Sequence, residues 1–128
     1  MWRKINVLFI GLLVSVLVYG ANDEQEIQYL IDFVAESGVT FIRNGTEHSA
    51  PEAADHLQMK YSRASRYART AEGFIDNLAS KSSITRRPYQ VVLADGTVLN
   101  ASDWLYGALH DYRALNQAAA QSSSAVSP

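Results

Sequence analysis

The first twenty residues, MWRKINVLFIGLLVSVLVYG, decide which part of the chain is left to form a folded domain. Arg3 and Lys4 precede an apolar stretch over residues 5–19, and Gly20 offers a small residue before Ala21, as in a secretory signal peptide. About 15 apolar residues fall short of the roughly 20 that cross a bilayer as a helix. We expect cleavage near Gly20/Ala21, export to the periplasm and no stable membrane span afterwards. An uncleaved anchor is the alternative.

The composition that remains limits both the stability and the partners of the domain. The chain has no cysteine, so burial of apolar side chains has to stabilise it without disulfides. After cleavage, nine basic and thirteen acidic residues leave a net charge of −4, which argues against nucleic acid or an anionic membrane as the main partner. Roughly 107 residues suit a single domain, expected over residues 21–116, with a disordered tail over 117–128.

The first half of this domain predicts helices around a short extended segment. Apolar residues at i, i+3, i+4 and i+7 within residues 23–37 line one helix face. Gly38 ends this helix, residues 39–42 read as an extended run, and residues 43–46 as a turn. Ser49 and Glu52 match a capping box that starts a second helix near residue 50. Because Thr70 and Gly73 interrupt its pattern, we expect two helical segments there.

The second half predicts a hairpin and a last helix. Residues 89–93 and 97–99 are rich in strand-forming side chains and flank Asp95-Gly96, a hairpin turn signal. Ser102 is expected to cap the last helix, which frays after Asn116. The predicted fold class is therefore α+β, with three or four helices packed on a small antiparallel hairpin, to which residues 39–42 can add a third strand.

Two groups of polar residues are candidates for a site. Glu52, His56 and Lys60 at i, i+4 and i+8 align on a helix, and with Glu47 and His48 they allow a metal site or a small hydrolase. The HExxH arrangement is absent, which favours a solvated ion-pair face with no metal and no cofactor. The turn that carries Arg43, Asn44 and His48 is the better binding candidate, since turns held by a scaffold commonly recognise ligands. Its simpler interpretation is a turn made by Asn44-Gly45 alone.

Serines and arginines supply further hypotheses. Ser82 or Ser83 could act as a nucleophile with His110 and Asp111, but no nucleophile motif supports this. A basic patch is the second hypothesis. It would suit an anionic glycan, a lipid head group or an acidic protein, although such runs are more often solvated surfaces. Its members are Arg63, Arg66, Arg69, Arg86 and Arg87.

Four ordered blocks of this sequence are similar to a known family. They are FIRNGTEH (residues 41–48), EAADHL (52–57), TAEGFID (70–76) and ASKSSIT (79–85) followed by Pro88-Tyr89, and the chain resembles the YfeK-like family of small exported bacterial proteins over about residues 26–113. The resemblance implies no established activity. It marks as motif positions, without assigned roles, Arg43, Asn44, Gly45, Glu47, His48, His56, Ser82, Ser83, Pro88 and Tyr89.

The chain departs from its relatives at two places. Relatives often carry cysteine around the positions of Val39 or Ala50, and glycine in place of Arg86. We therefore expect no disulfide here and a different shape for the loop before Pro88. The predicted function is a non-enzymatic periplasmic module that binds an unknown protein or envelope component. Its predicted surface comprises Arg43, Asn44, Glu47, His48, His56, Ser82, Ser83 and Tyr89.

Overall fold

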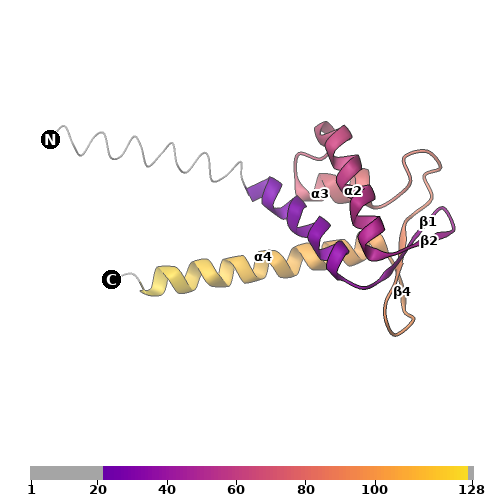
Figure 1. The fold of residues 1–128 in the computed structure, drawn as a ribbon. Helices are drawn as coiled ribbons and strands as arrows, with labels where there is room; N and C mark the ends of the chain where they lie inside the picture. The colour runs from indigo at the N-terminus through magenta and orange to yellow at the C-terminus, as the bar shows by residue number, and fades with distance from the viewer. Residues whose placement is uncertain (1–21, 127–128) are drawn as a thin grey trace.

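A computed structural model describes residues 22–126. Within this range four helices pack on a four-stranded antiparallel sheet (Figure 1), so the predicted α+β class is confirmed. The sheet is larger than the predicted hairpin. The expected signal peptide and residues 127–128 lie outside the described residues, and no helix inside them is long and apolar enough to cross a membrane.

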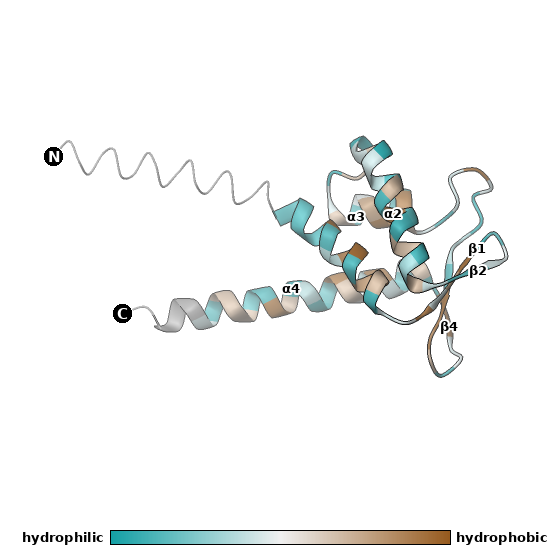
Figure 2. Ribbon diagram, viewed as in Figure 1, coloured by the Kyte–Doolittle hydropathy of each residue, from teal (hydrophilic) through white to brown (hydrophobic). Residues whose placement is uncertain are grey.

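The first helix covers residues 22–36 and packs beside α4, Ala101–Val126. All four residues of its predicted apolar face are buried: Ile27, Leu30, Ile31 and Val34. Gly38 follows with φ +71°, the left-handed conformation that ends many helices. Leu105 and Leu109 of α4 are buried as well. Figure 2 shows the hydrophobic segments where these helices meet the strands.

The end of α4 differs from the prediction. Where a disordered tail was expected from residue 117, α4 continues to Val126 and extends away from the body of the molecule (Figure 1). Residues 117–122 are all exposed, and their alanines and glutamines are good helix formers. The start differs too, because α4 begins at Ala101, so that Ser102 lies inside its first turn and not at the expected cap.

Two hairpins form the sheet, in the order β2-β1-β3-β4. The strands are β1, Thr40–Arg43; β2, Thr46–His48; β3, Gln90–Val92; and β4, Val98–Asn100. Asn44 and Gly45 join β1 to β2 with φ of 53° and 77°, as a two-residue hairpin with a primed turn requires. β1 also pairs with β3, Phe41 opposite Val91, which joins the predicted extended run to the predicted hairpin.

The middle of the chain contains the predicted break between helices. α2, Ala50–Ala64, ends in a 3-10 turn, η1, Ser65–Tyr67. The Thr70 hydroxyl then accepts from the Gly73 amide at 3.0 Å and caps α3, Ala71–Phe74, which continues as a π-helical turn, η2, Ile75–Ala79. The expectation of two segments is confirmed. Every residue of the main hydrophobic core lies between Ile27 and Leu109.

Candidate binding groove

The two predicted recognition loops meet in space. Asn44, in the turn between β1 and β2, donates from Nδ2 to the Ser82 hydroxyl at 3.4 Å. Its Oδ1 accepts from the Thr85 hydroxyl at 2.5 Å. These two bonds link segments 38 and 41 residues apart in sequence, so the turn and the loop over residues 80–89 form one surface.

Ser82 is the residue that organises this loop. It is buried, and its hydroxyl oxygen accepts from the Ile84 and Thr85 amides at 3.3 and 3.2 Å. Its own amide donates to the Arg87 carbonyl at 3.0 Å. With the bond from Asn44, the oxygen already has three donors, so Ser82 acts as a structural residue and not as the exposed nucleophile considered from the sequence.

A groove of about 410 Å³ runs between the turn, α2 and the loop. Six of the eight predicted binding residues line it, and the two that do not are Glu47 and His48. Four lining residues were not in the predicted binding set. Met59 and Ile84 belong to no motif, whereas the sequence placed Lys60 in a possible ion-pair face and Arg63 in the hypothesised basic patch. We call this set the basic groove: Arg43, Asn44, His56, Met59, Lys60, Arg63, Ser82, Ser83, Ile84 and Tyr89.

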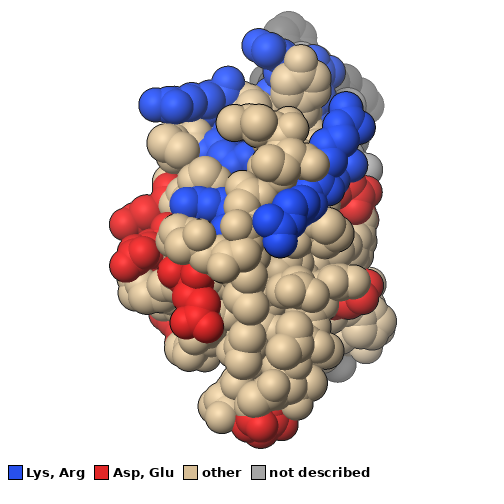
Figure 3. Space-filling model, turned by 90° about the vertical axis from the view of Figure 1, so that its right-hand side faces the viewer, with Lys and Arg blue, Asp and Glu red and all other residues tan. Residues whose placement is uncertain are grey.

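The charged side chains that line the basic groove are all positive. Arg43, Lys60 and Arg63 line it, and no aspartate or glutamate does. Among the described residues, none of these three cations forms an ion pair. Figure 3 shows Lys and Arg side chains gathered on one part of the face that carries the strands and loops, with acidic side chains toward its edges. A positive patch therefore lies on a chain of negative net charge.

Lys60 is the most confined of these cations. Its Nζ donates to the Tyr89 hydroxyl at 3.2 Å and to the Lys81 carbonyl at 3.4 Å, both neutral acceptors. Burial, and then the charge of Arg43, lower the pKa of Lys60. Burial raises the pKa of Tyr89, against the opposing effect of Arg43. The ammonium is thus partly desolvated without a counter-ion, which is an unfavourable arrangement.

His56 responds to the same positive field. Burial first, and then the charges of Arg43, Lys60 and His48, lower its pKa to about 4. The imidazole is therefore neutral at pH 7 and can donate and accept one hydrogen bond each. The neutral ring therefore adds a hydrogen-bonding group, and no further positive charge, beside Arg43 and Lys60.

The hypothesised metal ligands do not form a metal-binding group in the described part of the chain. His48 Nδ1 lies 3.5 Å from Glu52, so the Glu52 carboxylate contacts His48 while its amide uses the Ser49 cap. His56 lines the basic groove instead. Within residues 22–126 no group of three or more histidine, cysteine, aspartate or glutamate side chains could hold a metal ion.

The predicted arginine patch is split between different surroundings. Arg63 faces the basic groove, whereas Arg66 stacks on the Tyr67 ring, 4.8 Å from its centroid. Arg87 lies against the turn, where a Cβ built on Gly45 would meet its guanidinium at 3.7 Å. Arg63 therefore belongs to the basic groove, whereas Arg66 and Arg87 make other contacts.

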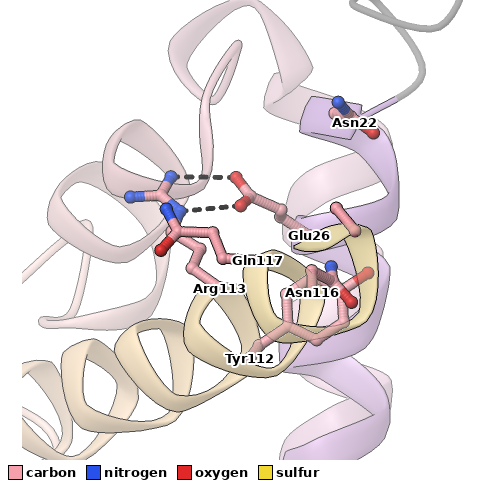
Figure 4. A pocket seen from close by; sticks show the side chains of 7 residues that line it. Asn22, Glu26, Tyr112, Arg113, Asn116 and Gln117 are labelled. Carbon is pink, nitrogen blue, oxygen red and sulfur yellow. Dashed lines mark hydrogen bonds and ion pairs between the residues drawn. The ribbon is translucent and has the colours of Figure 1, made fainter. Parts of the chain in front are cut away.

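A second hollow, between the first helix and α4, has a different character. Arg113 of α4 reaches Glu26 of the first helix through Nε and Nη2, at 2.7 and 2.9 Å (Figure 4). It also reaches Glu72 of α3 through Nη1 and Nη2, at 2.8 and 3.1 Å. Its hydrogen bonds to Glu26 and then to Glu72 raise the pKa of Arg113, and the bond from Arg113 lowers the pKa of Glu72. This guanidinium makes four hydrogen bonds to two carboxylates and joins three helices.

Comparisons with known proteins identify relatives whose function is not known. The family model "Family of unknown function (DUF5329)" matches residues 21–113. A Salmonella typhimurium protein named "Uncharacterized protein YfeK" is 36% identical over 91 residues, which cover 68% of this chain and 76% of that protein. No solved structure matches. The resemblance inferred from the motif blocks is thereby confirmed.

Proposed function

This chain belongs to DUF5329, a family of unknown function, and we propose that it is a non-enzymatic binding module of the periplasm. Its binding surface is the basic groove, and its ligand is an anionic component of the cell envelope. The absence of any acidic side chain among the lining residues carries this proposal. Cations on protein surfaces are usually interspersed with carboxylates, so three without one favour an anionic ligand.

Binding is favoured over catalysis by how the polar groups are used. The Ser82 oxygen is occupied by three donors. The charged groups that act on His56 are Arg43, Lys60 and His48, and none of them is a carboxylate that could orient it, whereas a catalytic triad needs a base that a third group orients. The groove therefore offers charge and hydrogen-bond donors without an activated nucleophile.

The periplasmic location is proposed from the N-terminal sequence pattern. Intact mass of protein recovered from the periplasmic fraction tests it. A mass that begins at Ala21 or Asn22 supports export and cleavage. A mass that begins at Met1, with the protein in the membrane fraction, contradicts it.

The binding surface is tested by photo-crosslinking in living cells. A photoreactive amino acid is placed at Ser83, in the groove, or at Glu47, which is exposed on β2 and lies outside the groove. We expect an adduct from position 83 only, and its loss when Arg43→Ala is added. Equal adducts from both positions, or an adduct that Arg43→Ala leaves unchanged, would contradict the assignment of the surface.

A further inference from the structure

The unpaired charge in the basic groove favours a particular kind of anion. Arg43, Lys60 and Arg63 offer three positive charges, and the Asn44 amide and Ser83 hydroxyl add neutral polar groups. A carboxylate has one charge and two oxygens, whereas a phosphate group has about −1.5 to −2 charges and three strong acceptor oxygens. Arginine forks and a lysine ammonium are the usual phosphate partners. The donor set therefore matches phosphate better than carboxylate.

An apolar edge borders these cations. Ile84 is 93% exposed and Met59 is 39% exposed, and both line the same groove. Ile84 is not on a loose loop, because the Ser82 oxygen accepts from its amide and Asn44 ties the loop to the β1–β2 turn. An isoleucine held in water by a fixed loop is poised to bury its side chain against a ligand.

Charge and apolar surface together specify an amphiphile. Resting on the proposed function, we infer that the basic groove binds a phosphate group carried on an apolar chain, as in an anionic phospholipid. The phosphate contacts Arg43 and Lys60, and the chain contacts Ile84 and Met59. The negative net charge of the whole chain does not oppose this, because screening in about 0.15 M salt confines surface fields to roughly 8 Å.

Three soluble probes distinguish binding of free phosphate from binding of a phosphate carried by a lipid. They are inorganic phosphate, dihexanoyl phosphatidic acid and dihexanoyl phosphatidylcholine, each held below the concentration at which it forms micelles. Binding is measured by calorimetry at constant ionic strength, with protein released from the cell envelope and its N-terminus established by intact mass. The monomeric probes keep binding in the groove separate from insertion into a bilayer.

We expect the phosphatidic acid to bind at least tenfold tighter than inorganic phosphate, and also tighter than the zwitterionic phosphatidylcholine. Lys60→Met should weaken both anions by about tenfold. Ile84→Ser should remove most of the difference in affinity between phosphatidic acid and inorganic phosphate, while the affinity for inorganic phosphate stays unchanged. The matched control is Arg69→Ala, at an exposed position outside the groove, which should change none of these affinities.

Two results would overturn the inference and leave the proposed function standing. One is Lys60-dependent binding of inorganic phosphate with no gain from the lipid chain. The other is a lipid gain that Ile84→Ser does not reduce. If neither anion binds in a Lys60-dependent way, the proposed anionic ligand itself is wrong. Phosphatidylcholine binding as tightly as phosphatidic acid would show that charge does not select the ligand, and would overturn both.

Discussion

Two positively charged regions of this molecule use their charge in opposite ways. Arg113 has two carboxylates on two other helices, and four hydrogen bonds of 2.7–3.1 Å fix its guanidinium. Lys60 has only a tyrosine hydroxyl and a backbone carbonyl as acceptors, and it shares its groove with two arginines. A cation with carboxylate partners joins helices, whereas cations gathered without carboxylates are available to a ligand from outside.

The difference separates structural residues from binding residues without any knowledge of the ligand. Removal of one partner from an ion pair leaves the other charge uncompensated and costs stability. Removal of a desolvated, unpaired charge costs little. Substitution should therefore cost much more stability at Arg113 than at Lys60.

The largest expected effect is on Arg113. Arg113→Ala removes both carboxylate contacts and leaves Glu26, whose side chain is 15% exposed, without its counter-ion. We expect the unfolding free energy to fall by about 2 kcal/mol and the melting temperature by roughly 10 °C. Thermal and urea unfolding measure this, with Arg69→Ala as the control. A loss of stability no larger than that of the control would contradict the structural role assigned to Arg113.

A smaller loss is expected at Ser82. Ser82→Ala leaves the Ile84 and Thr85 amides and the Asn44 side chain without their acceptor, and we expect a cost of about 1.5 kcal/mol. Because this serine shapes the loop, amide hydrogen exchange of residues 82–87 should also accelerate. Unchanged exchange would mean that the loop is held by other contacts.

The positive field should also make stability depend on pH through His56. Its pKa falls from an ordinary value of 6.5 to about 4 on folding, so between these values the unfolded chain binds more protons and stability decreases as pH falls from about 6.5 to about 4. Below pH 4 both states are protonated and the contribution stays constant. For this partly exposed ring we expect a loss of about 1 kcal/mol.

His56→Gln isolates this contribution. The variant should lose less stability than wild type between pH 6.5 and pH 4, as measured by urea unfolding at each pH. The groups that face His56 in this comparison are Arg43, Lys60 and His48. Lys60→Met should reduce the dependence of wild type, and identical curves for all three proteins would contradict the field inferred for the groove.

The smallest expected effect on stability is at Lys60 itself. Lys60→Met removes a partly desolvated ammonium and also its hydrogen bonds to Tyr89 and to the Lys81 carbonyl; we expect these effects to offset each other within about 0.5 kcal/mol. The same substitution should reduce the rise in melting temperature that phosphate causes in wild type at constant ionic strength. A loss comparable to that of Arg113→Ala would show that Lys60 is mainly structural.

Local sequence patterns predict much of this fold but not the contacts between residues far apart in the sequence. The apolar spacing of residues 27–34 and the Asn44-Gly45 turn predicted the first helix and a turn correctly. The strand Thr46–His48 was missed, because a short polar edge strand has no hydrophobic alternation and exists through its pairing with β1. The last turns of α4 were missed because their composition resembles a disordered tail.

The candidate site was likewise predicted only in part from the sequence. Motif blocks indicated Arg43, Asn44, His56, Ser82, Ser83 and Tyr89, which the structure brings together, but also Glu47 and His48, which lie outside the groove. Successive side chains of a strand point to opposite faces of the sheet, so the position of Glu47 outside the groove follows only once β2 is known. Ile84 and Met59 could not be selected, since exposed apolar side chains are common on protein surfaces and only their position beside the cations distinguishes them.

One departure from relatives has a physical consequence. Arg86, where the resemblance to the YfeK-like family leads us to expect glycine, adopts φ 61°, a left-handed conformation that glycine adopts at no steric cost. The loop therefore keeps a backbone shape suited to glycine while presenting an arginine. Whether the loop differs in shape from that of relatives stays a prediction.

The most direct test of the central claim is a titration of ¹⁵N-labelled protein with inorganic phosphate, followed by amide and arginine side-chain NMR signals. The account predicts saturable shifts confined to residues 43–44, 56–63 and 82–89, with the Arg113 guanidinium signal unchanged. Shifts spread evenly over all arginine-bearing surfaces, or centred on Arg113, would contradict the assignment of the basic groove as the anion-binding region.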